Sequence, residues 1–386
     1  MKILFVSTYP PTKCGIATYT SHLRAGIMQG TNLKEQDLPV LSIYPETWQG
    51  DDHHIYPLPK HNEKSYTRAA HWVNASDIDI VSLQHEFGIF GGRAGEWIIP
   101  FLETLKKPVV TTFHTVFQEE TLPYTPVQNI IAQRSDGIIV MNRLAIRYIS
   151  ELFHMPQKKI FYIPHGAPEP LRISRHRLKQ KWDVDGRKVL LTFGLLSPGK
   201  GIEYALDVLK DVARDVPDVL YLIAGQTHPE VKKREGETYR HTLIQRVETL
   251  GIRAHVRMID RFLSEEELTE LLTISDVYIS PYPGMAQITS GTLAYAVGLG
   301  RPVIATPYTY ARDLLRDFPE LLVPYGDTKT WKERLIELLT VDTKREALER
   351  KMMTLGRTMR WSVVGKRTKQ LLERYVRQKE AMFSHG

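Results

Sequence analysis

Residues 276–315 read DVYISPYPGMAQITSGTLAYAVGLGRPVIATPYTYARDLL, and this stretch carries the pattern that determines the fold class. A β-branched run at Val277–Ser280 predicts a strand, a helix of small residues begins near Gly291, and Val303–Ala305 predicts a second strand. A polar loop separates the first strand from the helix. Strand, loop, helix and strand in this order form a βαβ unit, which predicts a parallel sheet.

The same alternation of short β-branched runs and amphipathic stretches extends from one end of the chain to the other. After Lys200, for example, Ile202, Leu206, Leu209 and Val212 fall on one face of a helix that would pack on a sheet. The expected strands are Lys2–Ser7, Val40–Ile43, Ile78–Leu83, Val109–Phe113, Ile138–Met141 and Ile160–Ile163, then Val189–Phe193, Leu220–Ala224, Val256–Met258, Val277–Ser280, Val303–Ala305 and Leu321–Val323. We therefore predict an α/β protein with two doubly wound, Rossmann-like domains.

The 386 residues exceed what one hydrophobic core usually serves, so two domains are expected. Three prolines and a glycine between Pro164 and Ser174 predict the linker. We place the domains at residues 1–168 and 175–358, and the basic stretch Met359–Lys379 predicts a long helix, within 359–386, that packs back on the first domain. Open α/β sheets bind ligands at the carboxyl ends of their strands, so a cleft between the domains should hold the site.

Composition narrows the functional classes. With 42% hydrophobic and 25% charged residues the chain is globular, and its apolar runs are far shorter than the roughly 20 residues that span a bilayer, so we expect a cytoplasmic protein. The single cysteine, Cys14, excludes an intrachain disulfide and a cysteine zinc cluster. The net charge of +7 favours acidic partners such as nucleotide sugars or lipid phosphates. No motif supports nucleic-acid binding.

Three loops in the first half carry candidate site residues. Gly15 opens a helix after the first strand, where a helix N-terminus favours an anion or a sugar hydroxyl, or where the helix start simply needs a flexible residue. The segment LQHEFGIFGGRAGEW follows a strand and places His85 and Glu86 at the rim, before Gly91 and Gly92. Glu86 could bind sugar hydroxyls or act as a base, or be a solvated carboxylate in a structural turn. His114 stands where a further strand should end, and it is either structural or part of the site.

The second half contains the stronger candidates. TFGLLSPGKGIEYAL is a strand, a glycine loop and a helix with Lys200 at its start. This combination suits a diphosphate, or Lys200 is a surface lysine beside a turn. Gly201 follows Lys200, so this is not a P-loop. In residues 276–315, a polar loop containing Gln287, Thr289 and Ser290 precedes a small-residue helix that begins near Gly291. Donor phosphates would meet the first amides of this helix, at Gly291 and Thr292. Asp77 with Asp79, and Asp183 with Asp185, resemble DxD pairs but lie away from the predicted cleft, so no metal or other cofactor is expected.

At these residues the sequence resembles the retaining family-4 glycosyltransferases of GT-B fold. The motif order agrees over nearly the whole chain: YPPxxxGI, TFHT, IPHG where relatives often have PNG, FGxLxxxKG, LIAG, SEEEL, DVYISPY, GRPVIAT, and a late Trp361 before a terminal helix. The resemblance implies a hexosyltransferase with the donor in the C-terminal domain, the acceptor in the N-terminal domain, retention of configuration and no divalent metal.

The resemblance also implies roles for individual residues. Gly15 would lie against the donor phosphate, His114 would line the sugar pocket and Lys200 would hold the diphosphate. The expected catalytic residues are His114, Glu86 and Gln287; the expected donor-binding residues are Gly15, Gly194, Lys200, Gly225, Thr289, Ser290, Gly291 and Thr292; and the expected acceptor or sugar pocket contains His85, Gly91, Gly92 and His165.

The sequence departs from the family at three positions. Relatives usually have an arginine where this chain has Leu195, so the diphosphate lacks one cation. Gln287 and Tyr295 stand at the two positions of the E-x7-E pair, where the glutamates touch the donor sugar and the ribose. Gln287 can still exchange hydrogen bonds with a sugar, but Tyr295, at the ribose position, supplies no carboxylate.

Three functions stay open. The first is transfer from a nucleotide sugar to a carbohydrate or lipid-linked acceptor, and loss of one carboxylate partner costs only about 1–3 kcal/mol. The second is a glycoside phosphorylase, which the altered ribose position suggests. The third is a non-catalytic sugar- or nucleotide-binding protein. The basic terminal helix could also contact anionic lipid at the inner membrane face, or simply join the domains with a solvated face.

Overall fold

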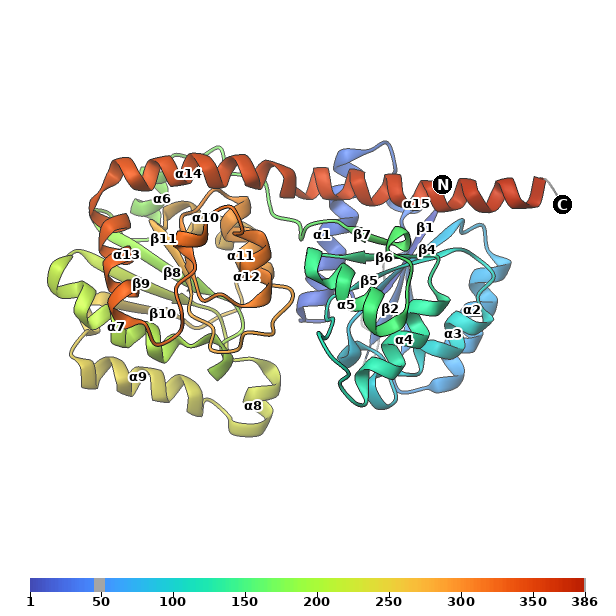
Figure 1. Cartoon of the computed structure of the whole chain (residues 1–386), viewed down its shortest axis with the longest axis horizontal. Coiled ribbons are helices and arrows are strands. Elements are labelled where there is room, and N and C mark those ends of the chain that lie inside the picture. Colours follow the sequence, from blue (N-terminus) through green and yellow to red (C-terminus); the bar gives the residue numbers. More distant parts are fainter. Residues whose placement is uncertain (45–52, 385–386) are drawn as a thin grey trace. The chain divides into compact units, whose positions relative to one another are not determined.

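The structure is a computed structural model that describes residues 1–44 and 53–384. The chain divides into two compact units, which we call unit 1 (Met1–Gly166 with Trp361–Gly386) and unit 2 (Ala167–Arg360). Each unit is built around one parallel sheet with helices packed on it (Figure 1). The predicted architecture of two Rossmann-like α/β domains is confirmed.

Unit 1 contains a seven-stranded sheet in the order β3-β2-β1-β4-β5-β6-β7. Its strands are β1 (Ile3–Ser7), β2 (Val40–Tyr44), β3 (Ile55–Pro59), β4 (Ile80–His85), β5 (Val109–Phe113), β6 (Gly137–Val140) and β7 (Ile160–Tyr162). Its α-helices are α1 (Gly15–Gly30), α2 (Glu63–Ala75), α3 (Ile98–Thr104), α4 (Tyr124–Arg134), α5 (Arg143–Phe153) and α15 (Trp361–Ser384). Every residue of β1, β4 and β5 is buried, as expected for parallel strands covered on both faces.

Unit 2 repeats this plan with five parallel strands in the order β10-β9-β8-β11-β12. The strands are β8 (Lys188–Phe193), β9 (Val219–Ala224), β10 (Val256–Ile259), β11 (Val277–Ser280) and β12 (Val303–Ala305). The α-helices are α6 (Arg175–Lys181), α7 (Ile202–Asp215), α8 (Pro229–Glu235), α9 (Thr238–Leu250), α10 (Glu265–Ile274), α11 (Gly291–Gly298), α12 (Thr309–Leu314), α13 (Thr328–Thr340) and α14 (Asp342–Gly356). The four predicted apolar positions of α7 are all buried.

Both sheets reverse their strand order at one point, between β1 and β4 in unit 1 and between β8 and β11 in unit 2. At such a switch point the loops leaving the two central strands separate to opposite sides, which opens a crevice at their carboxyl ends. The sequence-predicted loops after β1, β4, β8 and β11 all leave the sheets at these positions. Ligand binding is therefore favoured at the carboxyl edge of each sheet.

Three sequence expectations need correction. The strand β3 was not predicted, because its sequence IYPLP contains two prolines, which only an edge strand tolerates. The strand expected at Leu321–Val323 is wrong: Leu321 ends a 3₁₀ helix, only Leu322 forms an isolated bridge, and Pro324 then lacks the N–H that would continue a ladder. The terminal helix begins at Trp361 rather than Met359, and it extends to Ser384.

The terminal helix α15 packs along α1 within unit 1 (Figure 1). The backbones approach closely at two small residues, since a Cβ added to Gly26 of α1 would lie 2.3 Å from the Trp361 carbonyl oxygen. Gly365 meets the backbone of Gly26 from the other helix. The C-terminal end of the chain is thus part of the same core as its first helix.

Candidate active site

The loops that leave β8 and β11 bring a lysine, a tyrosine and a threonine together at the switch point of unit 2. Lys200 Nζ donates a hydrogen bond to the Tyr282 hydroxyl at 2.6 Å, and this hydroxyl lies 3.1 Å from Thr292 Oγ1. Lys200 and Thr292 are half-buried, whereas Tyr282 is almost fully buried and stacks on Tyr308 with ring centroids 5.0 Å apart. The predicted residues Lys200 and Thr292 therefore belong to one cluster, and Tyr282 joins it.

Tyr282 is held in a charged environment. Burial alone would raise the pKa of its phenol, but the ammonium group and hydrogen bond of Lys200, with weaker effects of the Thr292 and Ser280 hydroxyls, outweigh burial, so the pKa is lowered. The lysine ammonium also lies over the tyrosine ring, 4.5 Å from its centroid. From the sequence, Tyr282 could be assigned only to the end of a strand. Its neighbours in the sequence do not indicate that it will contact Lys200, which is 82 residues away.

Two glycines let the loops after β8 and β9 run close together. Gly225 has φ +137°, and a Cβ there would lie 2.0 Å from the Gly194 carbonyl oxygen. Gly194 in turn faces Thr292, whose Cγ2 would be 3.2 Å from an added Cβ, and Lys200. Gly194, Lys200 and Thr292 thus converge on one point, with Gly225 behind them.

The start of α11 contributes the remaining predicted donor residues. Ser290 is the N-cap, and its hydroxyl accepts a hydrogen bond from the Leu293 amide at 3.4 Å. The amides of Gly291 and Thr292 lie in the first turn, at the positive end of the helix. Gln287 is exposed and donates to the Thr289 carbonyl oxygen at 2.9 Å, so its side chain extends along this loop.

Tyr295, one turn further along α11, is buried, and its hydroxyl donates to Glu265 Oε2 at 3.2 Å. Glu265 is the first residue of α10 and is half-buried. Sequence reasoning did not select Glu265, which stands in a run of three glutamates that reads as an ordinary acidic helix start. Tyr295, which stands where the family pattern has a glutamate, therefore has the Glu265 carboxylate beside it in the fold.

Arg240 supports the Gly225 loop from α9 and was also missed by sequence reasoning. Its side chain is buried, and Nη2 donates to the Gly225 carbonyl oxygen at 2.9 Å and pairs with Asp260 at 2.7 Å. An arginine inside an amphipathic helix usually reads as a surface residue, so only the fold identifies it. Its role is to fix the backbone that Gly225 brings beside Gly194.

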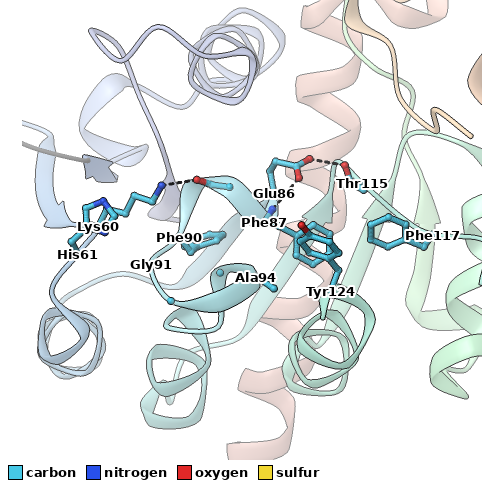
Figure 2. Close-up of a pocket in the computed structure, with 13 residues that line it drawn as sticks. Lys60, His61, Glu86, Phe87, Phe90, Gly91, Ala94, Thr115, Phe117 and Tyr124 are labelled. Carbon is cyan, nitrogen blue, oxygen red and sulfur yellow. Dashed lines mark hydrogen bonds between the residues drawn. The ribbon is translucent and has the colours of Figure 1, made fainter. Parts of the chain in front are cut away.

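In unit 1, the loop after β4 forms a pocket of about 660 Å³ around Glu86 (Figure 2). Thr115 Oγ1 donates to Glu86 Oε2 at 2.7 Å, and the Phe87 amide donates to Oε1 at 3.0 Å. Burial raises the pKa of the Glu86 carboxyl, although both hydrogen bonds act in the opposite direction. Glu86 is thus a positioned, partly desolvated carboxyl group and not a solvated one.

Aromatic rings line the same pocket. Phe87, Phe117 and Tyr124 contact one another with centroid separations of 4.9–5.8 Å, and Figure 2 shows them together on one side of Glu86. Lys60 lies on the other side and donates to the Gly88 carbonyl oxygen at 2.7 Å. Aromatic faces with a carboxylate are the groups that bind the apolar and hydroxyl faces of a sugar. Of this set, only Glu86 was predicted from the sequence.

The predicted glycines of this loop line the pocket, but His85 does not. Gly91 is required by close packing, since an added Cβ would lie 2.1 Å from the Trp97 ring, and Gly92 has φ +81°. His85, by contrast, is fully buried among phenylalanine rings, and neither ring nitrogen has a hydrogen-bond partner. Successive residues of a strand point to opposite faces, so Glu86 and His85 cannot share the rim.

His114 and His165 lie in a second cluster of unit 1, around Tyr19 and Trp361. The Tyr19 ring contacts His114 at 4.7 Å, His165 at 5.1 Å and Trp361 at 5.3 Å. Burial, with smaller effects of neighbouring histidines, lowers the pKa of His114 to about 3; burial also lowers the pKa of His165 to about 4. Both rings are neutral at pH 7.

The hydrogen-bond partner of His114 determines which of its two ring nitrogens carries the hydrogen. His114 Nε2 lies 3.0 Å from Gln84 Oε1, and an amide oxygen only accepts, so Nε2 carries the hydrogen. Nδ1 of this neutral ring is then a hydrogen-bond acceptor. His114 can bind a hydroxyl group but cannot act as a cation near neutral pH.

Gly15 begins α1 at the carboxyl end of β1 and is exposed, with no atom within 4 Å of an added Cβ. Cys14 is the N-cap, and its sulfur accepts from the Ala17 amide at 3.4 Å. The open surface at Gly15 permits close approach of a bound group to the first turn of α1.

The two DxD-like pairs have structural partners. Asp77 accepts from Lys2 Nζ at 2.7 Å and Asp79 from the Lys2 amide at 2.7 Å. Asp183 lies 3.6 Å from Arg257, and Asp185 lies 3.6 Å from His176. Within the described ranges 1–44 and 53–384, no group of three or more His, Cys, Asp or Glu residues could hold a metal ion.

Two family models match the chain in succession. Residues 41–169 match Glycosyltransferase Family 4, and residues 174–352 match Glycosyl transferases group 1. The first match lies in unit 1 apart from its last residues, and the second lies in unit 2.

Curated relatives agree over most of the chain. It is 25% identical over 312 residues to a phosphatidyl-myo-inositol mannosyltransferase of Mycobacterium leprae, which covers 80% of this chain and 76% of the relative. It is 24% identical over 358 residues to an alpha-monoglucosyldiacylglycerol synthase of Streptococcus pneumoniae, which covers 84% and 75%.

Solved structures share the fold at low sequence identity. Anabaena Alr3699/HepE, solved in complex with UDP and glucose, has a TM-score of 0.75 at 12% identity and covers 97% of this chain and 100% of its own. A sucrose-phosphate synthase of Thermosynechococcus elongatus has a TM-score of 0.74 at 14% identity, with full coverage of both chains. The fold is thus GT-B. With the two family matches and the converging lysine, glycines and helix start of unit 2, the chain is a glycosyltransferase of the GT-B type.

Proposed function

We propose that the protein transfers a hexosyl group from a nucleotide sugar to a carbohydrate or lipid-linked acceptor, with retention of anomeric configuration and without a divalent metal. The observation that carries this proposal is the convergence of Lys200, Thr292 and Gly194 at the start of α11. An ammonium, a hydroxyl and first-turn amides are the donors that a diphosphate needs. They also supply positive charge without a metal ion.

The donor half of the site follows from this cluster. The diphosphate lies against Lys200 and the first amides of α11, with Ser290, Gly291 and Thr292 around it, and the Gly194 and Gly225 backbones allow close approach. Gln287 and Thr289 extend along the loop before α11 and meet the hexose. Tyr282 holds the lysine ammonium in place through the 2.6 Å hydrogen bond. Gly15 accommodates a donor phosphate at the open start of α1.

The acceptor half lies in unit 1. The pocket around Glu86 supplies a carboxylate for hydroxyl groups and aromatic faces for the sugar ring, with Gly91 and Gly92 shaping its wall. His114, neutral and with Nδ1 as acceptor, binds a hydroxyl of the transferred sugar, and His165 supports the same cluster through Tyr19. Buried His85 packs beneath the loop and takes no part in binding.

The proposed step is a front-face displacement. The bond between the anomeric carbon and the leaving phosphate oxygen breaks, and the bond from the acceptor hydroxyl oxygen forms on the same face. The acceptor proton passes to the leaving phosphate. Lys200 and the α11 amides stabilise the negative charge that grows on the diphosphate as it leaves.

A thermal-shift panel of nucleoside diphosphates, nucleotide sugars and inorganic phosphate tests the proposal. A saturable shift by one nucleotide supports transfer, and at 100 times Kd it corresponds to about 2.7 kcal/mol. A shift by phosphate alone would instead favour a phosphorylase, which Tyr295 at the ribose position had suggested. No shift by any of them would favour a non-catalytic binding protein. Product NMR reports the anomeric configuration, and EDTA tests the independence from metal.

We also propose that the protein contacts anionic lipid, so that the acceptor is drawn from a membrane surface. No helix of the described residues is long and apolar enough to cross a membrane. The exposed side of α15 carries Lys366, Arg367, Arg374 and Arg377. Sedimentation with vesicles of anionic and of neutral lipid tests whether this basic side binds a charged surface.

A further inference from the structure

The hydrogen bond between Tyr295 and Glu265 joins two helices beside the proposed diphosphate site. The phenol oxygen of Tyr295 lies 3.2 Å from Glu265 Oε2, and the tyrosine side chain is buried while the glutamate is half-buried. The buried phenol therefore holds a carboxylate that still reaches the surface of unit 2.

Position along α11 relates this carboxylate to the diphosphate. Thr292 and Tyr295 are three residues apart on one helix, so their side chains are neighbours on its surface, about 5–6 Å apart at Cβ. A diphosphate held at Thr292 and the first amides would carry its next covalent group towards the following turn. In a nucleotide sugar, one phosphate bears the hexose and the other bears the ribose. Because the proposed function places the hexose at the loop before α11, the group that extends towards Tyr295 is the ribose.

The neighbouring glutamates show that Glu265 is not needed to form α10. Glu267 makes the capping box with Ser264 and pairs with Arg261 at 2.6 Å, so it has the structural role at this helix start. Glu265 instead contacts Tyr295. Each carboxylate oxygen can accept more than one hydrogen bond, so a carboxylate held by a phenol can also accept from a ligand hydroxyl.

We propose that Glu265, oriented by Tyr295, binds the ribose hydroxyls of the donor nucleotide. Acidic side chains recognise ribose hydroxyls in other Rossmann-like sheets, because a carboxylate accepts hydrogen bonds from a vicinal diol. The inference rests on the proposed function and deepens it: the carboxylate that the sequence lacks at position 295 is supplied from α10. It assigns the site a ribonucleoside diphosphate and not free phosphate.

Calorimetric titration of the full chain with UDP, GDP and their 2′-deoxy analogues tests this assignment. We expect the wild-type protein to bind the better ribonucleotide at least about tenfold more tightly than its 2′-deoxy form, the equivalent of one hydrogen bond to a charged group. Glu265→Gln should remove most of this preference, and Tyr295→Phe should reduce it. Glu266→Gln, at an exposed neighbouring position, is the matched control and should keep the preference.

The outcomes separate the two proposals. Equal affinity of wild-type protein for ribo- and deoxyribonucleotides, or an unchanged preference in Glu265→Gln, overturns the role of Glu265 and leaves nucleotide-sugar transfer standing. If neither nucleotide binds, the proposed function fails and this inference fails with it. Should Glu265→Gln not fold, an unchanged preference in Tyr295→Phe is sufficient to reject the pair.

Discussion

Lys200 and Tyr282 are 82 residues apart in the sequence, and the lysine ammonium donates to the tyrosine hydroxyl at 2.6 Å. Each comes from a different loop at the switch point of the unit 2 sheet. The contact directs the lysine charge towards Gly194 and Thr292, where the proposed diphosphate lies. Fixing a long, flexible side chain before the ligand arrives reduces the entropy lost on binding.

Lys200→Met should weaken binding of the preferred nucleoside diphosphate by about 10- to 100-fold, because a hydrogen bond to a charged group contributes roughly 1.5–3 kcal/mol. Tyr282→Phe should have a smaller effect, since the ammonium remains but loses its orientation. Titration calorimetry measures both. Lys210→Met, at an exposed position of α7, is the control, and equal affinities for all three variants would remove Lys200 from the site.

Glu86→Gln should raise the acceptor KM about tenfold while leaving the donor KM unchanged, because the amide keeps one acceptor oxygen but loses the charge. Kinetics with the acceptor varied at saturating donor provide the measurement. Glu96→Gln, in the same loop but exposed, is the comparison. A change confined to the donor KM would contradict the assignment of this pocket to the acceptor.

The same substitution has a pH signature in stability. Burial raises the pKa of Glu86 in the folded protein. The stability that the protonated carboxyl contributes is therefore fully present below the unfolded pKa of about 4.3, and it is lost as pH rises through the folded pKa. Glu86→Gln does not ionise. Its Tm relative to wild type should therefore increase between pH 4 and pH 7, and a difference that stays constant would contradict a raised pKa.

His85→Leu should stabilise the protein in acid. Burial lowers the pKa of His85 to about 3, so the stability of the neutral ring is fully present above the unfolded pKa of about 6.5 and is lost as pH falls towards the folded value. The Tm of the variant relative to wild type should rise from pH 7 to pH 4. A Tm difference that stays the same from pH 7 to pH 4 would contradict the lowered pKa of His85.

Gly225→Ala should lower the stability of the fold, whereas Gly15→Ala tests donor binding without a change in stability. The first places a Cβ 2.0 Å from the Gly194 carbonyl oxygen at φ +137°, so we expect a loss of at least about 2 kcal/mol in the free energy of unfolding. The second meets no atom within 4 Å and should leave stability unchanged. If Gly15→Ala nevertheless weakens donor binding, the open start of α1 contacts the donor; unchanged binding would exclude that role.

The order of elements could be predicted because it depends on local patterns. Strands such as Val109–Phe113 are continuous β-branched and aromatic runs, and α7 shows its buried face in the spacing of its apolar residues. Lys200 and the start of α11 could also be selected as candidates, since glycines and polar residues between a strand and a helix suit an anion. The proline-containing edge strand β3 escaped because its pattern is that of a loop.

The direction in which a side chain points, and the residues that it contacts, could not be predicted from the sequence. His85 and Glu86 are adjacent letters at a strand end, and only packing against Phe87, Phe90 and Phe113 determined that the histidine is the buried one. The pocket aromatics come from two separate loops, so no local window contains them.

The amino-acid sequence by itself therefore determined two Rossmann-like domains and the loops that we propose bind the donor, because backbone periodicity and helix starts are encoded within a few neighbouring residues. The tertiary structure alone decided that Lys200 meets Tyr282 and that Glu265 stands beside Tyr295. These pairs are 82 and 30 residues apart, and they form only when parallel strands align their carboxyl ends and bring distant loops to the same edge.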